Sequence, residues 1–452
     1  MDCMRRMNIM RKRSKMANNL PTITILGAGL SGISVAYHYL GKSIIYDKLD
    51  KIGGTASTEN YNGFLYDRGP HVLFTKDTYI INLLSKNTPV FKKVAKPMNI
   101  FKGKEFPHPA LFNLYRLPKE ERYKILLDFI EAYKNFDPNY RPMNYKDWCI
   151  RTQGKYFTEN YSDLYTRKFW CTDSENLTTE WIQTRIPIPS IQKALEGAFG
   201  LNEKQGYYFD EFIYPKRGGF GSFSNFWQER SNDITIKLNK EVALIDTNNK
   251  SIKFKDGTYQ YYNILISTIP LPELLNILPN MPNEIKTSVL KLKYTSLHYI
   301  NILLKGKWKR DFTWLYFYDK DIPISRLIPY TKISPYMAPK GYTSLQIEIP
   351  YCEKFSKDFT EISLYKLQEL GYIKQRNIIE MFESDLKYGY VIYNKDREEN
   401  LKKILDYLKN IGIYSLGRYG SWEYLWSYQV IAQAKEFTEK ISKNLMSWRQ
   451  PK

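Results

Sequence analysis

The first clear pattern in the chain is a short apolar run followed by glycines. Thr22–Leu26 is rich in β-branched residues, as a buried parallel strand should be. Glycines mark a turn at 27–32, Ser31–Leu40 has helical spacing that ends at Gly41, and Ser43–Asp47 is again a strand pattern. Strand, turn, helix and strand in this order predict a βαβ unit that opens a doubly wound sheet.

The rest of the chain shows two further patterns. Residues from about 75 to 205 have helical spacing and many aromatic side chains, as in Lys119–Asn135 and Ile188–Phe199, and predict a mainly helical insertion. Strand patterns dominate the remainder. The expected strands are Ile234–Leu238, Val242–Asp246, Ser251–Lys255, Tyr262–Ser267, Leu297–Leu304, Thr313–Tyr318, Thr343–Glu348 and Gly412–Leu416, and the last helices are Glu398–Asn410 and Tyr428–Leu445.

These patterns predict an α/β protein whose first domain is discontinuous. That domain is Rossmann-like and doubly wound, and it is accompanied by a helical insertion and by a second domain built on an antiparallel sheet. The first 20 residues are basic and have no apolar pattern, so we expect a disordered tail there. The expected division is residues 21–75, 206–282 and 400–452 for the first domain, 76–205 for the helical domain and 283–399 for the sheet domain.

The charge of the chain bears on its ligands. The formal net charge is +20, from 67 basic and 47 acidic residues, so anions are attracted in general. The basic residues are spread along the whole chain, with no long basic stripe beyond the first 15 residues. This distribution favours a basic surface with a local anion site over nucleic-acid binding.

Cysteine and histidine are few and scattered. Cys3, Cys149, Cys171 and Cys352 form no CxxC pair, so they predict neither a zinc site nor a disulfide framework and fit a reducing compartment. We expect no metal. The N-terminus lacks an apolar stretch of signal-peptide length, and the longest uncharged run, 22–41, is the strand, turn and helix described above. A cytoplasmic protein without a membrane span is therefore expected.

The glycine-rich turn has the spacing of a dinucleotide-binding loop. In the sequence GAGLSG, Gly27 permits the tight turn, Gly29 lets the backbone approach a pyrophosphate, and Gly32 allows the helix to pack closely on the strand. The helix N-terminus offers free N–H groups and a positive dipole end to phosphates. Asp47 lies at the end of the second strand, where a carboxylate can bind ribose hydroxyls.

A glycine pair after this acid favours FAD over NAD. Gly53 and Gly54 leave room for a second close approach of the backbone to the cofactor, which flavoproteins use and nicotinamide dehydrogenases do not need. We therefore predict FAD as the cofactor. Further cofactor contacts are expected from the neighbouring residues Leu30, Ser31, Lys48 and Thr55.

Several segments carry a family resemblance. Gly53-Gly54-Thr55-Ala56 and Asp67-Arg68-Gly69-Pro70-His71 resemble the FAD-dependent amine-oxidase superfamily, and within it the chain is most similar to UDP-galactopyranose mutases and protoporphyrinogen-oxidase-like proteins. The segments YTRKFW (165–170), RIP (185–187) and GRYGSWEY (417–424) are similar to the mutase segments YTxKQW, RIP and GRLGTYRY. The likeness runs from about residue 22 to residue 440, so it implies a flavoprotein fold for nearly the whole chain.

The resemblance also implies roles for particular residues. His71 would lie near the isoalloxazine ring, and Arg326 looks like the mutase arginine that clamps the substrate diphosphate, so both are catalytic candidates. An arginine fork suits a diphosphate, and a neutral imidazole suits a site beside a flavin. Further cofactor contacts would come from Gly417, Arg418, Tyr424 and the backbone of Val242. The candidates for substrate binding are Arg185, Lys216, Arg217, Arg326 and Trp422.

The chain departs from the mutase pattern at cations that would bind a diphosphate. Pro189 stands where the mutases have a basic residue, and Thr295 stands where they have an arginine. The segment YPKRGGF (214–220) looks instead like the YPxGG segment of the oxidase and desaturase branch. We expect Arg326 to point into a cleft between the flavin domain and the second sheet, with Lys216 or Arg217 nearby as a replacement cation.

Three functions remain open at this point. The first is a flavin oxidoreductase, the second is a mutase-like isomerase that works through reduced flavin, and the third is a non-catalytic flavoprotein or nucleic-acid-binding protein that only the charge favours. We predict an FAD-dependent enzyme that acts on an anionic, nucleotide-linked sugar in polysaccharide or glycoconjugate synthesis, with NAD(P)H as a candidate reductant. The alternative is an amine-oxidase- or protoporphyrinogen-oxidase-type enzyme with a non-sugar substrate.

Overall fold

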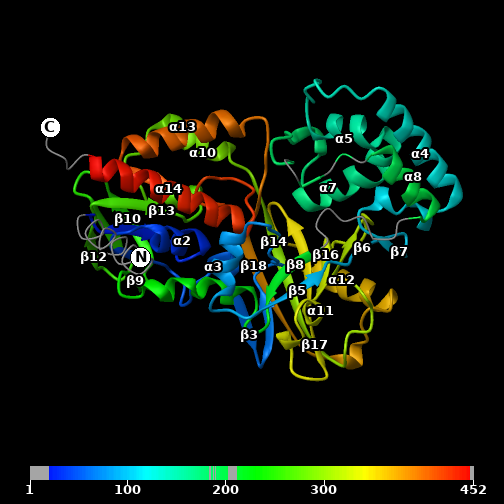
Figure 1. Ribbon diagram of the computed structural model, residues 1–452, viewed down its shortest axis with the longest axis horizontal. Coiled ribbons are helices and arrows are strands. Elements are labelled where there is room, and N and C mark those ends of the chain that lie inside the picture. The colour runs from blue at the N-terminus through cyan, green and yellow to red at the C-terminus, as the bar shows by residue number, and fades with distance from the viewer. Residues whose placement is uncertain (1–19, 183–184, 187, 189, 202–210, 448–452) are drawn as a thin grey trace, which may run out of the picture.

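The computed structural model of the chain describes residues 20–182, 185–186, 188, 190–201 and 211–447. Apart from Leu20, the expected disordered tail at 1–20 lies outside these residues, as do Pro187 and Pro189. Figure 1 shows the described chain as a doubly wound part at one end, a large sheet in the middle and a group of helices at the other end. No helix among the described residues is long and apolar enough to cross a lipid bilayer.

A five-stranded parallel sheet forms the centre of the first part. Its order is β19–β13–β1–β2–β9, and every neighbouring pair is parallel. All four residues of β1 are buried, because helices cover a parallel sheet on both faces. The strands are β1 (Ile23–Leu26), β2 (Ser43–Tyr46), β9 (Ile234–Lys237), β13 (Ile264–Ser267) and β19 (Ile413–Ser415).

Helices from both ends of the chain cover this sheet. Helix α2 (Leu30–His38) packs against β1, β2 and the last helix, α14 (Ser427–Ser447). Helix α13 (Arg397–Asn410) packs against α10 (Asn283–Lys291) and β19, as Figure 1 shows. A small antiparallel sheet lies beside them, with the strands β10 (Val242–Asp246), β11 (Ser251–Phe254) and β12 (Tyr259–Tyr261). The predicted doubly wound α/β part is thereby confirmed.

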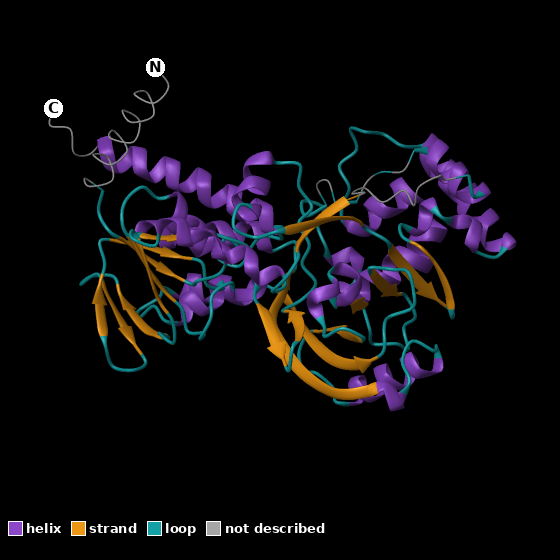
Figure 2. Ribbon diagram, turned by 60° about the horizontal axis from the view of Figure 1, so that its bottom comes forward, coloured by secondary structure: helices purple, strands orange, loops and turns teal. Residues whose placement is uncertain are grey.

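A curved seven-stranded sheet forms the second part, and Figure 2 shows it apart from the parallel sheet. Its order is β18–β14–β17–β16–β15–β6–β7, and its pairs are antiparallel except that β15 runs parallel to β6. The second sheet was predicted to be antiparallel, and the parallel pair of β15 and β6 is the difference from that prediction. The strands are β18 (Ile378–Val391), β14 (Tyr294–Lys305), β17 (Tyr342–Tyr351), β16 (Arg326–Pro329), β15 (Trp314–Phe317), β6 (Pro97–Phe101) and β7 (Lys104–Pro107).

The expected start of the helical domain at residue 76 is wrong. Strands β6 and β7 come from that segment but extend the seven-stranded sheet, and β5 (Val90–Val94) pairs with β8 (Glu211–Pro215). These pairings join residues far apart in the chain, so local periodicity does not reveal them. Helix α3 (Thr78–Ser85) also belongs elsewhere, because it packs against the 3₁₀ helix η6 (Phe220–Arg230).

The helices between residues 119 and 199 gather at the far end of the molecule in Figure 1. Asn144 caps α5 by accepting a hydrogen bond from the Asp147 N–H, and Ser190 caps α8 by accepting one from the Lys193 N–H. A π-helical turn at Thr158–Ser162 precedes α7. The helices are α4 (Lys119–Lys134), α5 (Tyr145–Gln153), α6 (Lys155–Phe157), α7 (Asp163–Trp170) and α8 (Ile191–Phe199).

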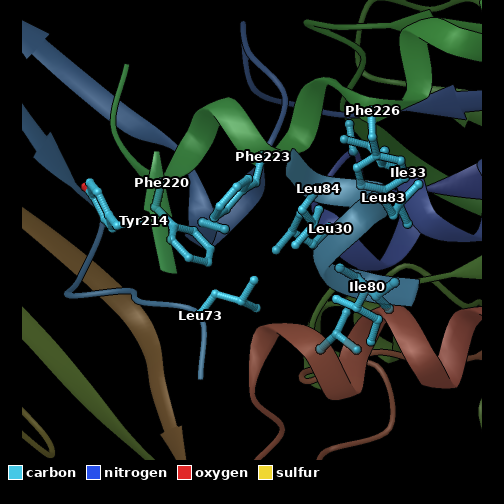
Figure 3. Close-up of a cluster of buried hydrophobic side chains, with 14 of the residues drawn as sticks. Leu30, Ile33, Leu73, Ile80, Leu83, Leu84, Tyr214, Phe220, Phe223 and Phe226 are labelled. Atoms are coloured by element: carbon cyan, nitrogen blue, oxygen red, sulfur yellow. The ribbon is translucent and has the colours of Figure 1, made fainter. Parts of the chain in front are cut away.

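A buried apolar cluster joins the first part to the segments around it, as Figure 3 shows. In Figure 3, Ile33 of α2 and Leu83 of α3 lie beside Phe226 of η6. This packing supports α2, which follows the glycine-rich turn.

The other elements are β3 (Thr58–Tyr61), β4 (Phe64–Asp67), α9 (Leu271–Asn276), α11 (Tyr330–Ile333) and α12 (Asp358–Glu369).

Candidate cofactor and substrate site

A cavity of about 850 Å³ runs from the glycine-rich turn to the face of the seven-stranded sheet. Gly29, Asp47 and Val242 line one end of it, and Arg326 and Tyr390 line the other. This volume lies within the range of pockets that hold cofactors and drug-sized ligands. The predicted cofactor residues Gly27, Leu30, Ser31, Lys48, Gly53, Gly54, Thr55, His71, Arg418 and Tyr424 also line the cavity.

The three glycines of the turn have different steric environments. Gly27 has a φ of +101°, which favours glycine, and a Cβ on Gly32 would lie 1.9 Å from the carbonyl oxygen of Gly27. The fold itself therefore requires both residues. A Cβ on Gly29, in contrast, would meet no atom nearer than 3.8 Å. The absence of a side chain at Gly29 therefore keeps space open in the cavity and is not needed for packing of the protein core.

The start of α2 and Asp47 together form a polar cradle. Gly29 is the N-cap of α2 and no side chain caps the helix, so its first N–H groups can bind an anion at the cavity. The Asp47 carboxylate accepts hydrogen bonds from the backbone N–H of Ala28, at 2.6 Å, and of Leu49, at 2.8 Å. Uncapped N–H groups beside a fixed carboxylate fit the diphosphate and ribose of a dinucleotide.

The glycine pair has a second role that the sequence reasoning missed. Gly53 forms a parallel bridge with Gly29, and its N–H donates to the Ala28 carbonyl at 2.8 Å. A Cβ on Gly54 would lie 3.1 Å from the Cα of Gly29. Both Gly53 and Gly54 have positive φ values, of +104° and +57°. The pair is thus required for packing against the glycine-rich turn, besides the close approach to a cofactor predicted from the sequence.

His71 lies on the cavity wall with its protonation state fixed by its surroundings. Its Nδ1 is 2.7 Å from the Gly69 carbonyl, and because a carbonyl only accepts, Nδ1 carries the proton. Burial lowers the pKa of His71 to about 4, and the positive charges of Arg418 and Arg326 act in the same direction. A neutral imidazole therefore faces the cavity at pH 7.

Because the pKa of His71 is lowered in the folded protein, we expect the free energy of unfolding to decrease in acid. The unfolded chain protonates His71 at its ordinary pKa of 6.5, whereas the folded chain resists protonation down to about 4. The free energy of unfolding therefore decreases as the pH falls from 6.5 towards 4, by at most about 3 kcal/mol. His71→Asn should remove this part of the loss, as measured by urea unfolding of flavin-free protein at pH 7.5 and 4.5. Identical pH dependence in both proteins would contradict the assignment.

Arg326 lines the cavity but has a charged partner that the sequence reasoning missed. Its Nη2 lies 2.8 Å from Oε2 of Glu348, which is fully buried on the neighbouring strand, and 3.2 Å from the Tyr390 hydroxyl. The Tyr390 and Ser325 hydroxyls both donate to Oε1 of Glu348, at 3.2 and 3.0 Å. Burial acts to lower the pKa of Arg326, but Glu348 outweighs it and holds the pKa well above its ordinary value. Arg326 is therefore positively charged.

The signal for Glu348 was present in the sequence. It is the sole acid in the apolar run TSLQIEIP at 343–350, and its strand lies beside that of Arg326 with the two residues directly opposite. A buried carboxylate is rarely tolerated unless it is paired, so an acid in such a run points to a cation on the adjacent strand.

Two more arginines line the same end of the cavity. Arg418 donates to the carbonyls of Leu425, at 2.8 Å, and Gly389, at 3.0 Å. Arg185 is buried, donates to the carbonyls of Trp181 and Tyr424, and stacks over the Tyr424 ring at 4.8 Å. Three arginines thus line this end of the cavity, together with one fully buried carboxylate, that of Glu348. Because the arginines outnumber the carboxylate, this end of the cavity suits an anion.

Aromatic side chains form most of the wall between these charges. Phe169 of α7 stacks on Tyr390 of β18, with ring centroids 4.0 Å apart, and so joins the helical part to the large sheet. Tyr165, Tyr299 and Tyr316 also line the cavity. The sequence analysis named Tyr165 within the segment YTRKFW (165–170), but it assigned none of these tyrosines to a cavity wall. Such a wall excludes water and can stack on a flat ring.

Two residues predicted to bind substrate, Lys216 and Arg217, do not line the cavity. Lys216 and Arg217 are exposed, and the Arg217 guanidinium lies 3.9 Å from the centre of the Tyr336 ring. The expectation that one of them lies beside Arg326 is wrong. Their segment is instead anchored by Tyr214, whose hydroxyl donates to the buried Asp67 at 2.5 Å.

Trp422 and Gly417 also differ from expectation. Trp422 is fully buried against Tyr294 and Tyr388 and does not line the cavity, so its assignment to substrate binding is wrong. Its large apolar surface is used in the protein core. Gly417 lies behind the cavity wall, where a Cβ would come within 2.0 Å of the Ser31 hydroxyl. Gly417 therefore supports the start of α2 by close packing.

Comparisons with known proteins agree with this architecture. Residues 25–86 match the family of NAD(P)-binding Rossmann-like domains. Among solved structures, reduced UDP-galactopyranose mutase superimposes with a TM-score of 0.86 at 23% identity, covering 93% of this chain and 94% of that one. The chain has the flavoprotein fold that its motifs predicted. The predicted resemblance is confirmed at the level of the fold.

Other relatives share the fold at lower similarity. A protoporphyrinogen-oxidase-like protein from an Exiguobacterium species has a TM-score of 0.72 at 14% identity, over 94% of this chain and 99% of that one. In sequence, the protoporphyrinogen oxidase of Dictyostelium discoideum is 22% identical over 357 residues, which cover 63% of this chain and 66% of that protein. The match thus spans just under two thirds of the relative's length.

Proposed function

We propose that the protein is an FAD-dependent enzyme that acts on an anionic, nucleotide-linked sugar. The observation that carries the proposal is the continuity of one cavity from the cradle at Gly29 and Asp47 to the end lined by Arg326. A dinucleotide at the cradle can extend its reactive ring towards Arg326, where a substrate anion would find positive charge. Similarity in fold to UDP-galactopyranose mutase supports the choice of a nucleotide sugar.

Particular residues would hold the cofactor. The N–H groups at the start of α2 would bind the diphosphate, Asp47 the ribose, and the backbone of Val242 the adenine. Bound FAD supplies hydride-accepting or nucleophilic chemistry at its isoalloxazine ring. His71 stays neutral and donates its Nδ1 proton to the Gly69 carbonyl, so it would present a fixed, uncharged face to that ring.

At the end of the cavity lined by Arg326, the side chains would bind and orient the substrate. Arg326 is held by Glu348 and Tyr390, so its guanidinium has a fixed position before substrate arrives. Arg185 and Arg418 are held by backbone carbonyls in the same way. Arginines that are fixed in advance orient a diphosphate without losing side-chain freedom when it binds.

A second candidate function is a flavin oxidoreductase with a non-sugar substrate. The observation in its favour is the ion pair itself, because Glu348 neutralises the arginine that a diphosphate would need. Lys216 and Arg217 do not restore that charge at the cavity. An uncharged aromatic substrate would fit the wall formed by Tyr165, Phe169 and its neighbours.

Flavin spectroscopy separates these functions. We expect purified protein to carry non-covalent FAD, to be reduced by NADPH without oxygen, and then to convert a nucleotide sugar without net oxidation. Protein that neither carries nor takes up FAD would exclude both candidates. FAD-loaded protein that binds neither UDP nor any nucleotide sugar, while a non-sugar substrate reduces its flavin, would establish the oxidoreductase instead.

A further inference from the structure

Two cysteines that are far apart in the sequence meet at the edge of the helical part. Cys171 follows the last residue of α7, and Cys352 follows the last residue of β17. Although 181 positions separate them, Cys352 Sγ lies 3.2 Å from the carbonyl oxygen of Cys171. The two side chains are also close enough for each to shift the pKa of the other. The spacing of the cysteines in the sequence does not reveal this pairing.

The two thiols differ in a way that suits exchange chemistry. Cys352 is exposed and Cys171 is half-buried. The hydrogen bond from Cys171 lowers the pKa of Cys352 because it stabilises the Cys352 thiolate, and it raises the pKa of Cys171. Cys149, in contrast, is buried, and burial raises its pKa. Cys352 is thus both the more accessible and the more readily ionised thiol of the pair.

We propose that Cys171 and Cys352 form a reversible disulfide by exchange with a small disulfide such as oxidised glutathione. The Cys352 thiolate attacks one sulfur of the reagent, forms a mixed disulfide and releases one glutathione thiolate. Cys171 then loses its proton to solvent and attacks the Cys352 sulfur, which releases the second glutathione. The two protein thiols lose two electrons and two protons in all, and the reagent is reduced to two thiols.

This disulfide would tie two walls of the cavity together. Helix α7, which ends just before Cys171, carries Tyr165 and Phe169, and β17, which ends just before Cys352, carries Glu348. The bond therefore fixes the helical part against the large sheet. A ligand that must part these walls to leave would be released more slowly from the oxidised protein.

Peptide mapping tests the bond directly. We would use the Cys3→Ser protein, since Cys3 lies outside the described residues, and treat it with oxidised glutathione before alkylation and trypsin digestion. Trypsin should release residues 169–185 joined to residues 341–354, and dithiothreitol should separate them. Cys149 is the internal control and should be alkylated only after unfolding. Separate glutathione adducts on the two cysteines, a disulfide between two chains, or two freely alkylated thiols would each overturn the proposal.

A flavin-release assay tests the consequence for the cavity. Oxidation should slow the release of FAD or of bound UDP from the Cys3→Ser protein, and dithiothreitol should restore the original rate. The Cys3→Ser/Cys352→Ser variant cannot form the bond and should release ligand at one rate under both conditions. Peptide mapping that finds the disulfide, together with unchanged release, would overturn the role of the bond at the cavity and leave the modification site itself established.

Discussion

Replacing Gly29 with valine is expected to abolish FAD binding while the chain still folds. Gly29 has a φ of −73°, which any residue adopts, and a Cβ there would meet no protein atom nearer than 3.8 Å. The valine side chain would instead occupy the space in which a diphosphate approaches the start of α2. The flavin absorbance of purified protein should be lost, and thermal unfolding should match that of flavin-free wild type.

Two other glycines provide matched controls for this substitution. Gly32→Ala would place its Cβ 1.9 Å from the Gly27 carbonyl oxygen, so this variant should be strongly destabilised whether or not flavin is present. Gly257 has a φ of +83° in a hairpin with no atom within 4 Å of an added Cβ, so Gly257→Ala should keep FAD and cost only about 1 kcal/mol. Normal flavin content in the Gly29→Val protein would place the cofactor elsewhere.

The doubly wound part could be predicted because its signals are local. A run of four buried residues, a turn of required glycines and a helix follow one another within the segment 23–38, and each is recognisable by itself. The strands β6 and β7, at one end of the seven-stranded sheet, were missed for the opposite reason. Each has only four or five residues and is recognisable as part of a sheet only through its pairing with β15 or its neighbour.

The residues that line the cavity at the glycine-rich turn could be predicted for the same reason, whereas those that line it around Arg326 could not. Arg326 was found through a resemblance, and Glu348 stands out in the sequence as the acid in an apolar run. Their pairing, however, depends on strand register, which the sequence alone does not supply. Lys216 and Arg217 lie next to a buried tyrosine in the sequence, yet both side chains are exposed on the protein surface. Closeness to a buried residue in the sequence therefore did not predict which cationic side chains line the cavity.

Neutralising Glu348 and removing the charge of Arg326 should change anion affinity in opposite directions. Glu348→Gln keeps a hydrogen-bonding side chain but leaves the Arg326 charge uncompensated, so UDP should bind about tenfold more tightly to the FAD-loaded protein. Arg326→Met removes the cation and leaves the buried carboxylate, so UDP should bind at least about tenfold more weakly. Calorimetric titration at constant ionic strength measures both changes.

Stability measurements separate this electrostatic effect from damage to the fold. Arg326→Met leaves a buried charge without its partner and should cost about 3–5 kcal/mol, whereas Arg326→Met combined with Glu348→Gln should recover much of that loss. Arg310→Met removes a half-exposed pair with Glu105 that does not line the cavity, so UDP affinity should not change. If the Glu348 and Arg326 variants shift UDP affinity in the same direction, the ion pair only supports the sheet, and the substrate anion must bind to Arg185 or Arg418.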